Sequence, residues 1–186
     1  MVNTKRDRLA GFTIVELLIV IVVIAILAAI SIVAYNGIQT RAENSKTVTA
    51  VSSWVKALQL YKIDKGNYPP THSCLGDSST YVGSHAGRCW ALINDPTWVV
   101  NPTFLSQMSD YIGSNPSPSS KDVNANTGGN QFRGAMYYRQ SVGNEYIYLH
   151  MVGSTSAADC PIVGSLISAG GTQRPSGISC YYRLPQ

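Results

Sequence analysis

Ala10-Gly11-Phe12-Thr13-Ile14-Val15-Glu16 opens the stretch that decides the fold, and a continuous apolar run from Leu17 to Ile30 follows it. Residues 12–34 contain only three polar side chains, those of Thr13, Glu16 and Ser31. About 20 predominantly apolar residues are enough to cross a bilayer as a helix. The stretch therefore predicts a membrane-spanning helix over residues 12–34.

Glu16 does not fit a simple membrane anchor. A carboxylate in hydrocarbon is costly unless it is paired, and an ionisable residue inside a span suggests a function. No Lys or Arg lies between Glu16 and Arg41, so we expect Glu16 to have no local partner. The partner should come from another chain or from a newly created amino terminus.

A cleavable secretory signal is one alternative for this stretch. Such a signal has a basic start, an apolar core of 7–15 residues and a small-x-small cleavage site after it. The basic start is present in residues 5–8, but the apolar run is too long, and the nearest small-x-small triplet, Ala29-Ile30-Ser31, lies inside it. A plain signal anchor is a second alternative, and it leaves Glu16 unexplained.

A short basic leader ending in Gly11, followed by Phe-Thr-x-x-Glu and the apolar run, resembles the class III signal of type IV pilins and pseudopilins. The resemblance implies that prepilin peptidase cleaves after Gly11 and methylates the new amino-terminal Phe12. It also implies that the Phe12 amine of a neighbouring subunit neutralises Glu16 as a filament assembles. Many members of the family carry Pro where this chain has Val33. Because Pro kinks a helix, we expect a straighter helix here.

Length and charge limit the other possibilities. A chain of 186 residues suits one soluble domain plus one span. Half of the net charge of +4 lies in residues 1–11, and the weak basic bias of the rest does not indicate nucleic-acid binding. By the positive-inside rule, residues 1–11 stay in the cytoplasm as a leader and the carboxy-terminal part is exported.

All four cysteines lie in the exported part. An even number of cysteines in an oxidising space predicts disulfides, and three pairings are open. We favour Cys74–Cys89 and Cys160–Cys180, since each joins near neighbours in the sequence. A zinc site is the alternative, because His72-x-Cys74 and His85-x3-Cys89 mix metal-binding residue types. Their spacing is not that of a zinc knuckle, so we expect no metal.

Residues 35–66 are predicted to continue the same helix. Apolar and small residues recur every three or four positions from Tyr35 to Leu58, which indicates one packing face. Trp54 and Tyr61 are expected in the core. Lys65-Gly66-Asn67-Tyr68-Pro69-Pro70 should end the helix, since Gly suits the position after the last turn and Pro cannot continue it. This exit also resembles that of many pilins and pseudopilins.

Residues 67–186 are predicted to form an exported globular head. Residues 134–140 and 145–151 should pair as an antiparallel hairpin, and 178–184 could add a third strand. In the second strand, Ile147, Leu149 and Met151 should face the long helix, which leaves Tyr146, Tyr148 and His150 outward. Residues 90–93 and 103–112 could be short helical pieces, and residues 113–131 a mobile surface loop. The expected class is α+β: a long helix packed on a small antiparallel sheet, as in pilins.

No catalytic motif is present: the sequence has no Gly-x-Ser-x-Gly elbow, no phosphate-binding loop and no His-Glu-x-x-His. We therefore expect no enzyme and no cofactor.

The predicted function is a structural subunit of a type IV pilus-like filament. Its expected partners are copies of itself, prepilin peptidase, the pilus assembly platform and, before assembly, the cytoplasmic membrane. The assembled filament should be extracellular.

Two alternatives stay open. One is a periplasmic type II secretion pseudopilin; the major pseudopilin often has calcium ligands in its carboxy-terminal loop, where this chain has only Asp159. The other is a minor pilin that binds DNA through Arg133, Arg139, Arg174 and Arg183 with neighbouring Tyr.

Overall fold

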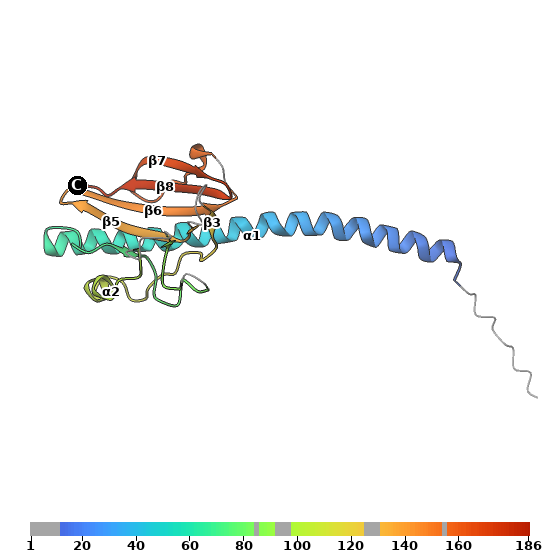
Figure 1. Ribbon diagram of the computed structural model, residues 1–186, viewed down its shortest axis with the longest axis horizontal. Helices are drawn as coiled ribbons and strands as arrows, with labels where there is room; N and C mark the ends of the chain where they lie inside the picture. Colours follow the sequence, from blue (N-terminus) through green and yellow to red (C-terminus); the bar gives the residue numbers. More distant parts are fainter. Residues whose placement is uncertain (1–11, 84–85, 92–97, 125–130, 154–155) are drawn as a thin grey trace, which may run out of the picture. The chain divides into compact units, whose positions relative to one another are not determined.

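The structure is a computed structural model that describes residues 12–83, 86–91, 98–124, 131–153 and 156–186. The chain divides into two compact units, Met1–Gln39 and Thr40–Gln186. The first contributes the amino-terminal part of a long helix, and the second contains the rest of that helix with two sheets (Figure 1). The described elements, in chain order, are α1 (Ile14–Lys65), β1 (Ser73–Cys74), β2 (Trp90–Ala91), α2 (Pro102–Met108), β3 (Val123–Asn124), β4 (Gln131–Phe132), β5 (Ala135–Ser141), β6 (Asn144–Val152), η1 (Ala157–Asp159), β7 (Ile167–Arg174) and β8 (Gly177–Arg183).

Helix α1 runs without a break through Val33 and lies within the predicted residues 12–66, beginning two residues later and ending one residue earlier. It stops where the sequence supplies a terminator. Gly66 has a positive φ of 78°, a conformation that Gly adopts without a steric penalty. The Gly66 N–H donates to the Lys62 carbonyl at 2.8 Å, and Lys62 and Lys65 place positive charge at the negative end of the helix dipole.

The main sheet has five antiparallel strands in the order β1-β5-β6-β8-β7. The predicted hairpin is β5 and β6, joined by a turn at Gly143, and the predicted third strand is β8. Strand β7, which the sequence did not indicate, pairs with β8 at the edge. A long helix on a small antiparallel sheet confirms the predicted α+β class.

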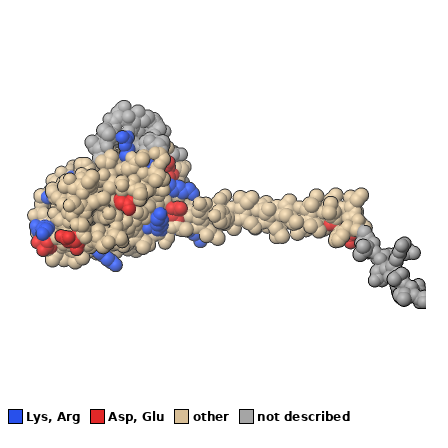
Figure 2. Space-filling view, turned by 90° about the horizontal axis from the view of Figure 1, so that it is seen from below, with Lys and Arg blue, Asp and Glu red and all other residues tan. Residues whose placement is uncertain are grey.

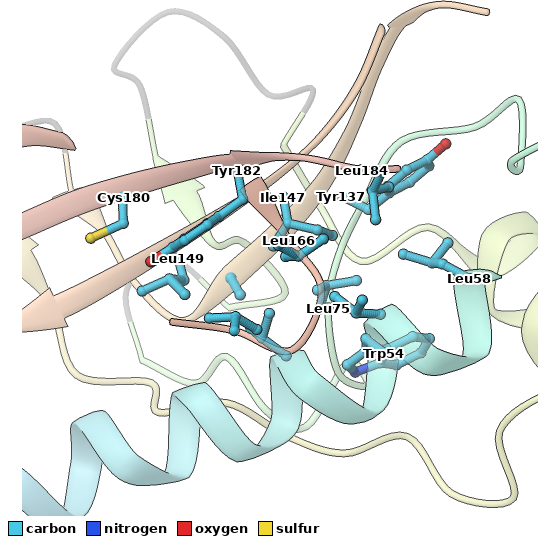
Figure 3. Close-up of a cluster of buried hydrophobic side chains, with 14 of the residues drawn as sticks. Trp54, Leu58, Leu75, Tyr137, Ile147, Leu149, Leu166, Cys180, Tyr182 and Leu184 are labelled. Atoms are coloured by element: carbon cyan, nitrogen blue, oxygen red, sulfur yellow. The ribbon is translucent and has the colours of Figure 1, made fainter. Parts of the chain in front are cut away.

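The core lies between the second half of α1 and one face of the sheet (Figure 3). Val51, Trp54 and Leu58 are fully buried and follow one another at helical spacing. They pack in the same cluster as Ile147 and Leu149 of β6, so these strand residues face the helix as predicted. Tyr61 is only half-buried and stacks edge-on against Tyr111.

A second, three-stranded sheet has the order β2-β4-β3. It corrects two predictions. Trp90-Ala91 is a strand rather than the start of a helical piece, because it pairs with β4. Residues 113–124 are not simply a surface loop: Ser119 is 4% exposed and Val123 of β3 is fully buried, while residues 125–130 of the predicted loop lie outside the described residues. The predicted helical piece at 103–112 is α2, which begins at Pro102 and is capped by Asn101.

Candidate functional site

The first turn of α1 holds Glu16 in a capping box. The Thr13 N–H and hydroxyl donate to Glu16 Oε2 at 2.9 Å and 2.8 Å, and the Glu16 N–H donates to Thr13 Oγ1 at 3.2 Å. Thr13 is thus a local hydrogen-bond partner of Glu16 that the prediction, which considered only charged partners, did not foresee. The Thr-x-x-Glu spacing was the signal that could have revealed the pairing.

The capping box leaves the charge of Glu16 uncompensated. Both of its bonds come from neutral groups, and both go to Oε2. Among the described residues, Oε1 makes no hydrogen bond and no cation lies within ion-pair distance of the carboxylate. The residue is thus held in one orientation and can still receive a positive group.

The apolar side chains of residues 12–39 are exposed throughout. The exposed fraction ranges from 47% at Val22 and Val23 to 85% at Ile14. This part of α1 is almost free of charged atoms in Figure 2, and α1 is the one helix in the described residues long and apolar enough to cross a membrane. An apolar surface of this extent needs lipid or other protein to cover it.

The remaining hydroxyl in the span is also satisfied within the helix. Ser31 Oγ donates to the Leu27 carbonyl at 2.7 Å, one turn back. All three polar side chains of residues 12–34 therefore find hydrogen bonds inside the helix, which lowers their cost in hydrocarbon. Phe12 is described and 84% exposed, whereas Gly11 and the rest of the predicted leader lie outside the described residues.

The head contains the two disulfides that the sequence favoured, Cys74–Cys89 and Cys160–Cys180. Cys74 and Cys89 are bonded to each other and so are not free thiolate ligands. Of the two histidines in the zinc alternative, His72 packs against the Trp98 ring at 5.3 Å and His85 lies outside the described residues. No cluster of metal-binding side chains is found in the part of the chain that the structure describes.

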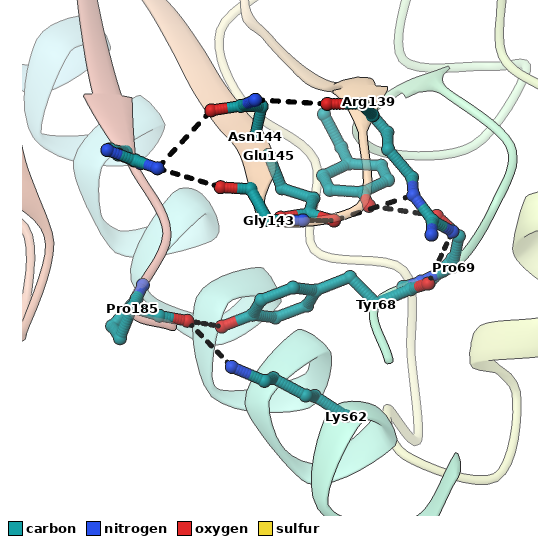
Figure 4. Close-up of polar contacts among 11 residues, drawn as sticks. Lys62, Tyr68, Pro69, Arg139, Gly143, Asn144, Glu145 and Pro185 are labelled. Atoms are coloured by element: carbon teal, nitrogen blue, oxygen red, sulfur yellow. Dashed lines mark hydrogen bonds and ion pairs between the residues drawn. The ribbon is translucent and has the colours of Figure 1, made fainter. Parts of the chain in front are cut away.

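A network of hydrogen bonds ties the helix exit to the sheet and to the last residues of the chain (Figure 4). Tyr68 Oη and Lys62 Nζ both donate to the Pro185 carbonyl, at 2.9 Å and 3.0 Å. Arg139 donates to the Tyr68 carbonyl at 2.9 Å and pairs with the buried Glu145 at 3.4 Å. Burial, together with the charge of Glu145, raises the pKa of Tyr68 to about 12, so the phenol remains a donor at neutral pH.

The four arginines proposed for DNA binding are engaged within the head. Arg133 is buried and donates to the carbonyls of Val82 and Arg88. Arg139 belongs to the network just described, and Arg174 lies over the Phe132 ring at 4.3 Å. The exposed Arg183 donates to the Gly143 carbonyl and to Asn144, at 2.9 Å and 3.2 Å. This arrangement does not favour a phosphate-binding surface, because Arg133 and Arg139 form ion pairs with Asp122 and Glu145 and so are not free to bind phosphate.

His150 is buried at 3% exposure, which corrects the prediction that it is a surface residue. It does lie on the sheet face away from α1, but there the Phe132 ring of β4 covers it at 5.2 Å. Its Nδ1 lies 2.9 Å from Ser179 Oγ. Burial, and then the charge of Arg174, lowers the pKa of His150 to about 3.

Comparisons with known proteins find matches, one of which covers the amino-terminal segment. Residues 6–32 match a family model described as the prokaryotic N-terminal methylation motif. Type II secretion system core protein G of Aeromonas hydrophila is 31% identical over 98 residues, which are 53% of this chain and 59% of that protein. The protein of the same name from Escherichia coli (strain K12) is 35% identical over 69 residues, 37% of this chain and 48% of that protein.

A fimbrial protein is similar to a comparable degree. Fimbrial protein EcpC of Eikenella corrodens is 36% identical over 96 residues, 52% of this chain and 63% of that protein. The chain spans about half the length of the curated relatives it matches, and no solved structure matches it. The motif and these relatives confirm the resemblance to the type IV pilin and pseudopilin family.

Proposed function

We propose that this chain is a filament subunit of the pseudopilin type, anchored in the cytoplasmic membrane before assembly and polymerised through residues 12–34. Prepilin peptidase cleaves the precursor after Gly11 and methylates Phe12. The observation that carries this proposal is Glu16, oriented by Thr13 at the start of an apolar helix whose side chains are uncovered.

The partner of Glu16 is the Phe12 amine of an adjacent subunit. Cleavage after Gly11 creates a positive charge four residues from Glu16, and the same pair of charges recurs on every copy. A charge pair is far less costly in an apolar surrounding than an unpaired carboxylate. Joining the Phe12 amine of one copy to Glu16 of the next therefore sets the axial register of the filament.

Packing of residues 12–34 from several copies supplies the cohesion. Inside the membrane these side chains contact lipid; in the filament they contact one another, through van der Waals packing rather than a new hydrophobic driving force. Because Thr13 and Ser31 are bonded internally, the charges of Glu16 and of the Phe12 amine are the ones to be compensated during that exchange.

The relatives named type II secretion system core protein G favour a periplasmic filament of a secretion system over a surface pilus. From the sequence, the scarcity of acidic residues near Asp159 placed the pseudopilin second to the pilus subunit. The names of these relatives reverse that order. EcpC supports the second candidate, a type IV pilus-like subunit. The two differ in location: a pseudopilin filament stays in the periplasm with an assembly platform, whereas a pilus is recovered from sheared cell surfaces.

Replacing Glu16 with Ala tests the proposed pairing in cells. We expect the variant to be cleaved normally but to be nearly absent from the filament fraction, because the Phe12 amine of the next subunit loses its partner. Glu43→Ala is the matched control, since Glu43 lies on the same helix beyond the apolar span. Filaments of normal abundance from Glu16→Ala would contradict the register mechanism.

A further inference from the structure

The face of the main sheet turned away from α1 carries a connected row of aromatic rings. We call Trp90, Trp98, Tyr138, Tyr148 and Tyr181 the aromatic row. Ring centroids are 5.0 Å apart from Trp90 to Trp98, 5.4 Å from Trp98 to Tyr138, 6.3 Å from Tyr138 to Tyr148 and 5.9 Å from Tyr148 to Tyr181. The first and last of these pairs are stacked, so each of these four rings turns a face towards its neighbour in the row.

The strand register places these rings together. Tyr148 of β6 is directly opposite Tyr181 of β8, and Tyr138 of β5 is diagonal to Tyr148. Gly170 of β7 makes room for the last ring: it lies at a bulge with φ of 145°, and a Cβ there would be 2.5 Å from the Tyr181 hydroxyl. Because glycine has no side chain, Gly170 leaves room for the Tyr181 ring.

The aromatic row is not sealed into the core. Its five residues are all half-buried, so each keeps solvent-accessible surface. A hollow of about 240 Å³ opens among four of them, with Met136 also in its lining. The rings facing the helix on the other side of the sheet, such as Tyr137 and Tyr182, are instead fully buried.

Polar groups of the row remain unused. The hydroxyls of Tyr138, Tyr148 and Tyr181 make no hydrogen bond within the described residues. Trp90 Nε1 is buried and likewise has no partner there. Burial raises the pKa of Tyr148 above its usual value, and a neutral phenol can both donate and accept a hydrogen bond.

We propose that the aromatic row binds a neutral oligosaccharide. Sugar rings present C–H groups to the electron-rich faces of aromatic rings and carry hydroxyls at their edges. The row offers half-buried aromatic rings with tyrosine hydroxyls beside them, and no Asp, Glu, Lys or Arg lines the hollow among them. Single-stranded nucleic acid also stacks on aromatic rings, but it needs a positively charged groove, and no Lys or Arg lines this hollow. A proline-rich peptide offers carbonyl acceptors only. It would therefore accept hydrogen bonds from the tyrosine hydroxyls but leave their capacity as acceptors unused.

Binding is measured with the full-length protein in a detergent that has no sugar headgroup. The probes are three neutral oligosaccharides (cellohexaose, chitohexaose and maltohexaose), with oligo-dT and a polyproline peptide as competitors from other classes. Titration calorimetry gives the affinity. Quenching of tryptophan fluorescence reports contact with Trp90 and Trp98, while the core residue Trp54 provides a constant background.

We expect at least one of the three sugars to bind saturably. Trp98→Ala and Tyr148→Ala should each weaken that binding roughly tenfold, the scale on which one lost ring weakens a stacked ligand. Tyr148→Phe should retain most of it, because the ring face is kept. Tyr111→Ala is the matched control, since Tyr111 is half-buried against Tyr61 and lies outside the row; it should bind normally.

Three outcomes would overturn the proposal: no binding of any of the three sugars, binding that Tyr148→Ala and Trp98→Ala leave unchanged, or binding of oligo-dT or polyproline in place of sugar. Thermal melting of each variant shows whether it is folded, and Tyr181→Ala replaces any variant that is not. The filament proposal is tested separately, because Tyr148→Ala should assemble as the wild type does.

Discussion

Val22 and Val51 lie on the same helix, yet Val22 is 47% exposed and Val51 is fully buried. The polar side chains differ in the same way. Those of residues 12–34 bond within the helix, as Ser31 does to Leu27. Several of those in residues 40–186 instead link segments far apart in the sequence: Asn44 both donates to and accepts from the backbone of Val152, at 3.0 Å each.

The difference indicates two kinds of stability within one chain. Residues 14–39 satisfy their backbone hydrogen bonds within the helix, so this segment can exchange lipid for protein neighbours without refolding. Residues 40–186 depend on contacts between distant elements and should unfold cooperatively. A change in one region should therefore leave the stability of the other nearly unchanged.

The largest effect on stability is expected from the core of the head. Trp54→Ala should lower the free energy of unfolding by about 3–5 kcal/mol, because a fully buried ring and its hydrogen bond to the Pro116 carbonyl are both lost. Leu18→Ala, at a residue 55% exposed, should leave the unfolding of the head unchanged. Denaturation of both variants in detergent micelles, followed by near-UV circular dichroism, measures this contrast; equal effects would refute it.

Removing a disulfide should have the next largest effect. The double variant Cys160→Ser, Cys180→Ser should lose roughly 3 kcal/mol, because the unfolded chain gains the freedom of an open loop. Residues 12–39 contain no cysteine, so helical far-UV signal from that segment should survive reduction of the wild type. If reduction abolished all helical signal, the two regions would not be independent.

A pH effect is expected from His150. Because its pKa is about 3 in the folded state and ordinary when unfolded, the unfolded chain binds a proton below about pH 6.5 that the folded chain does not. Stability should therefore fall as the pH drops from about 6.5 towards 3, by up to about 1.4 kcal/mol per pH unit, and be unaffected above that window.

His150→Phe provides the comparison, since it keeps a ring and cannot titrate. Ser179 Oγ would retain its bond from Arg174 Nε at 3.2 Å. The variant should show a shallower loss of stability between pH 6.5 and 4, measured by denaturant unfolding at each pH. An unchanged slope would mean that other groups cause the acid sensitivity.

The smallest effect is expected at the start of α1. Thr13→Val removes the capping hydroxyl and should destabilise the first turn by about 1 kcal/mol, seen as faster amide exchange at residues 14–17. Ser31→Ala, which removes a hydroxyl from the middle of the span, should not change exchange there. Protection of the first turn that is the same in Thr13→Val and the wild type would show that the capping box contributes nothing.

The structural features that were predicted correctly from the sequence are those that depend on the spacing of residues close together in the chain. The helix ends, the β5–β6 hairpin and the inward set of Ile147 and Leu149 all follow from periodicity and from Gly and Pro. Strand β7 was missed because its Gly170-Gly171 pair breaks the alternating pattern.

The site was less predictable because its surroundings are assembled from distant segments. His150 alternates with the core residues as predicted, but its burial depends on Phe132, a residue of another sheet. The acceptors of Arg133 likewise come from the loop around residues 82–88. By contrast, the Thr13–Glu16 bond was local, and its spacing was visible in the sequence.

Mass spectrometry of the amino-terminal peptide in the assembled fraction tests the central claim most directly. Filaments are collected from the periplasm and from sheared cell surfaces, and the membrane is analysed alongside. The filament proposal predicts a peptide that begins with methylated Phe12, enriched in one of the two filament fractions. Chains that begin at Met1, found in the membrane and absent from both filament fractions, would contradict it.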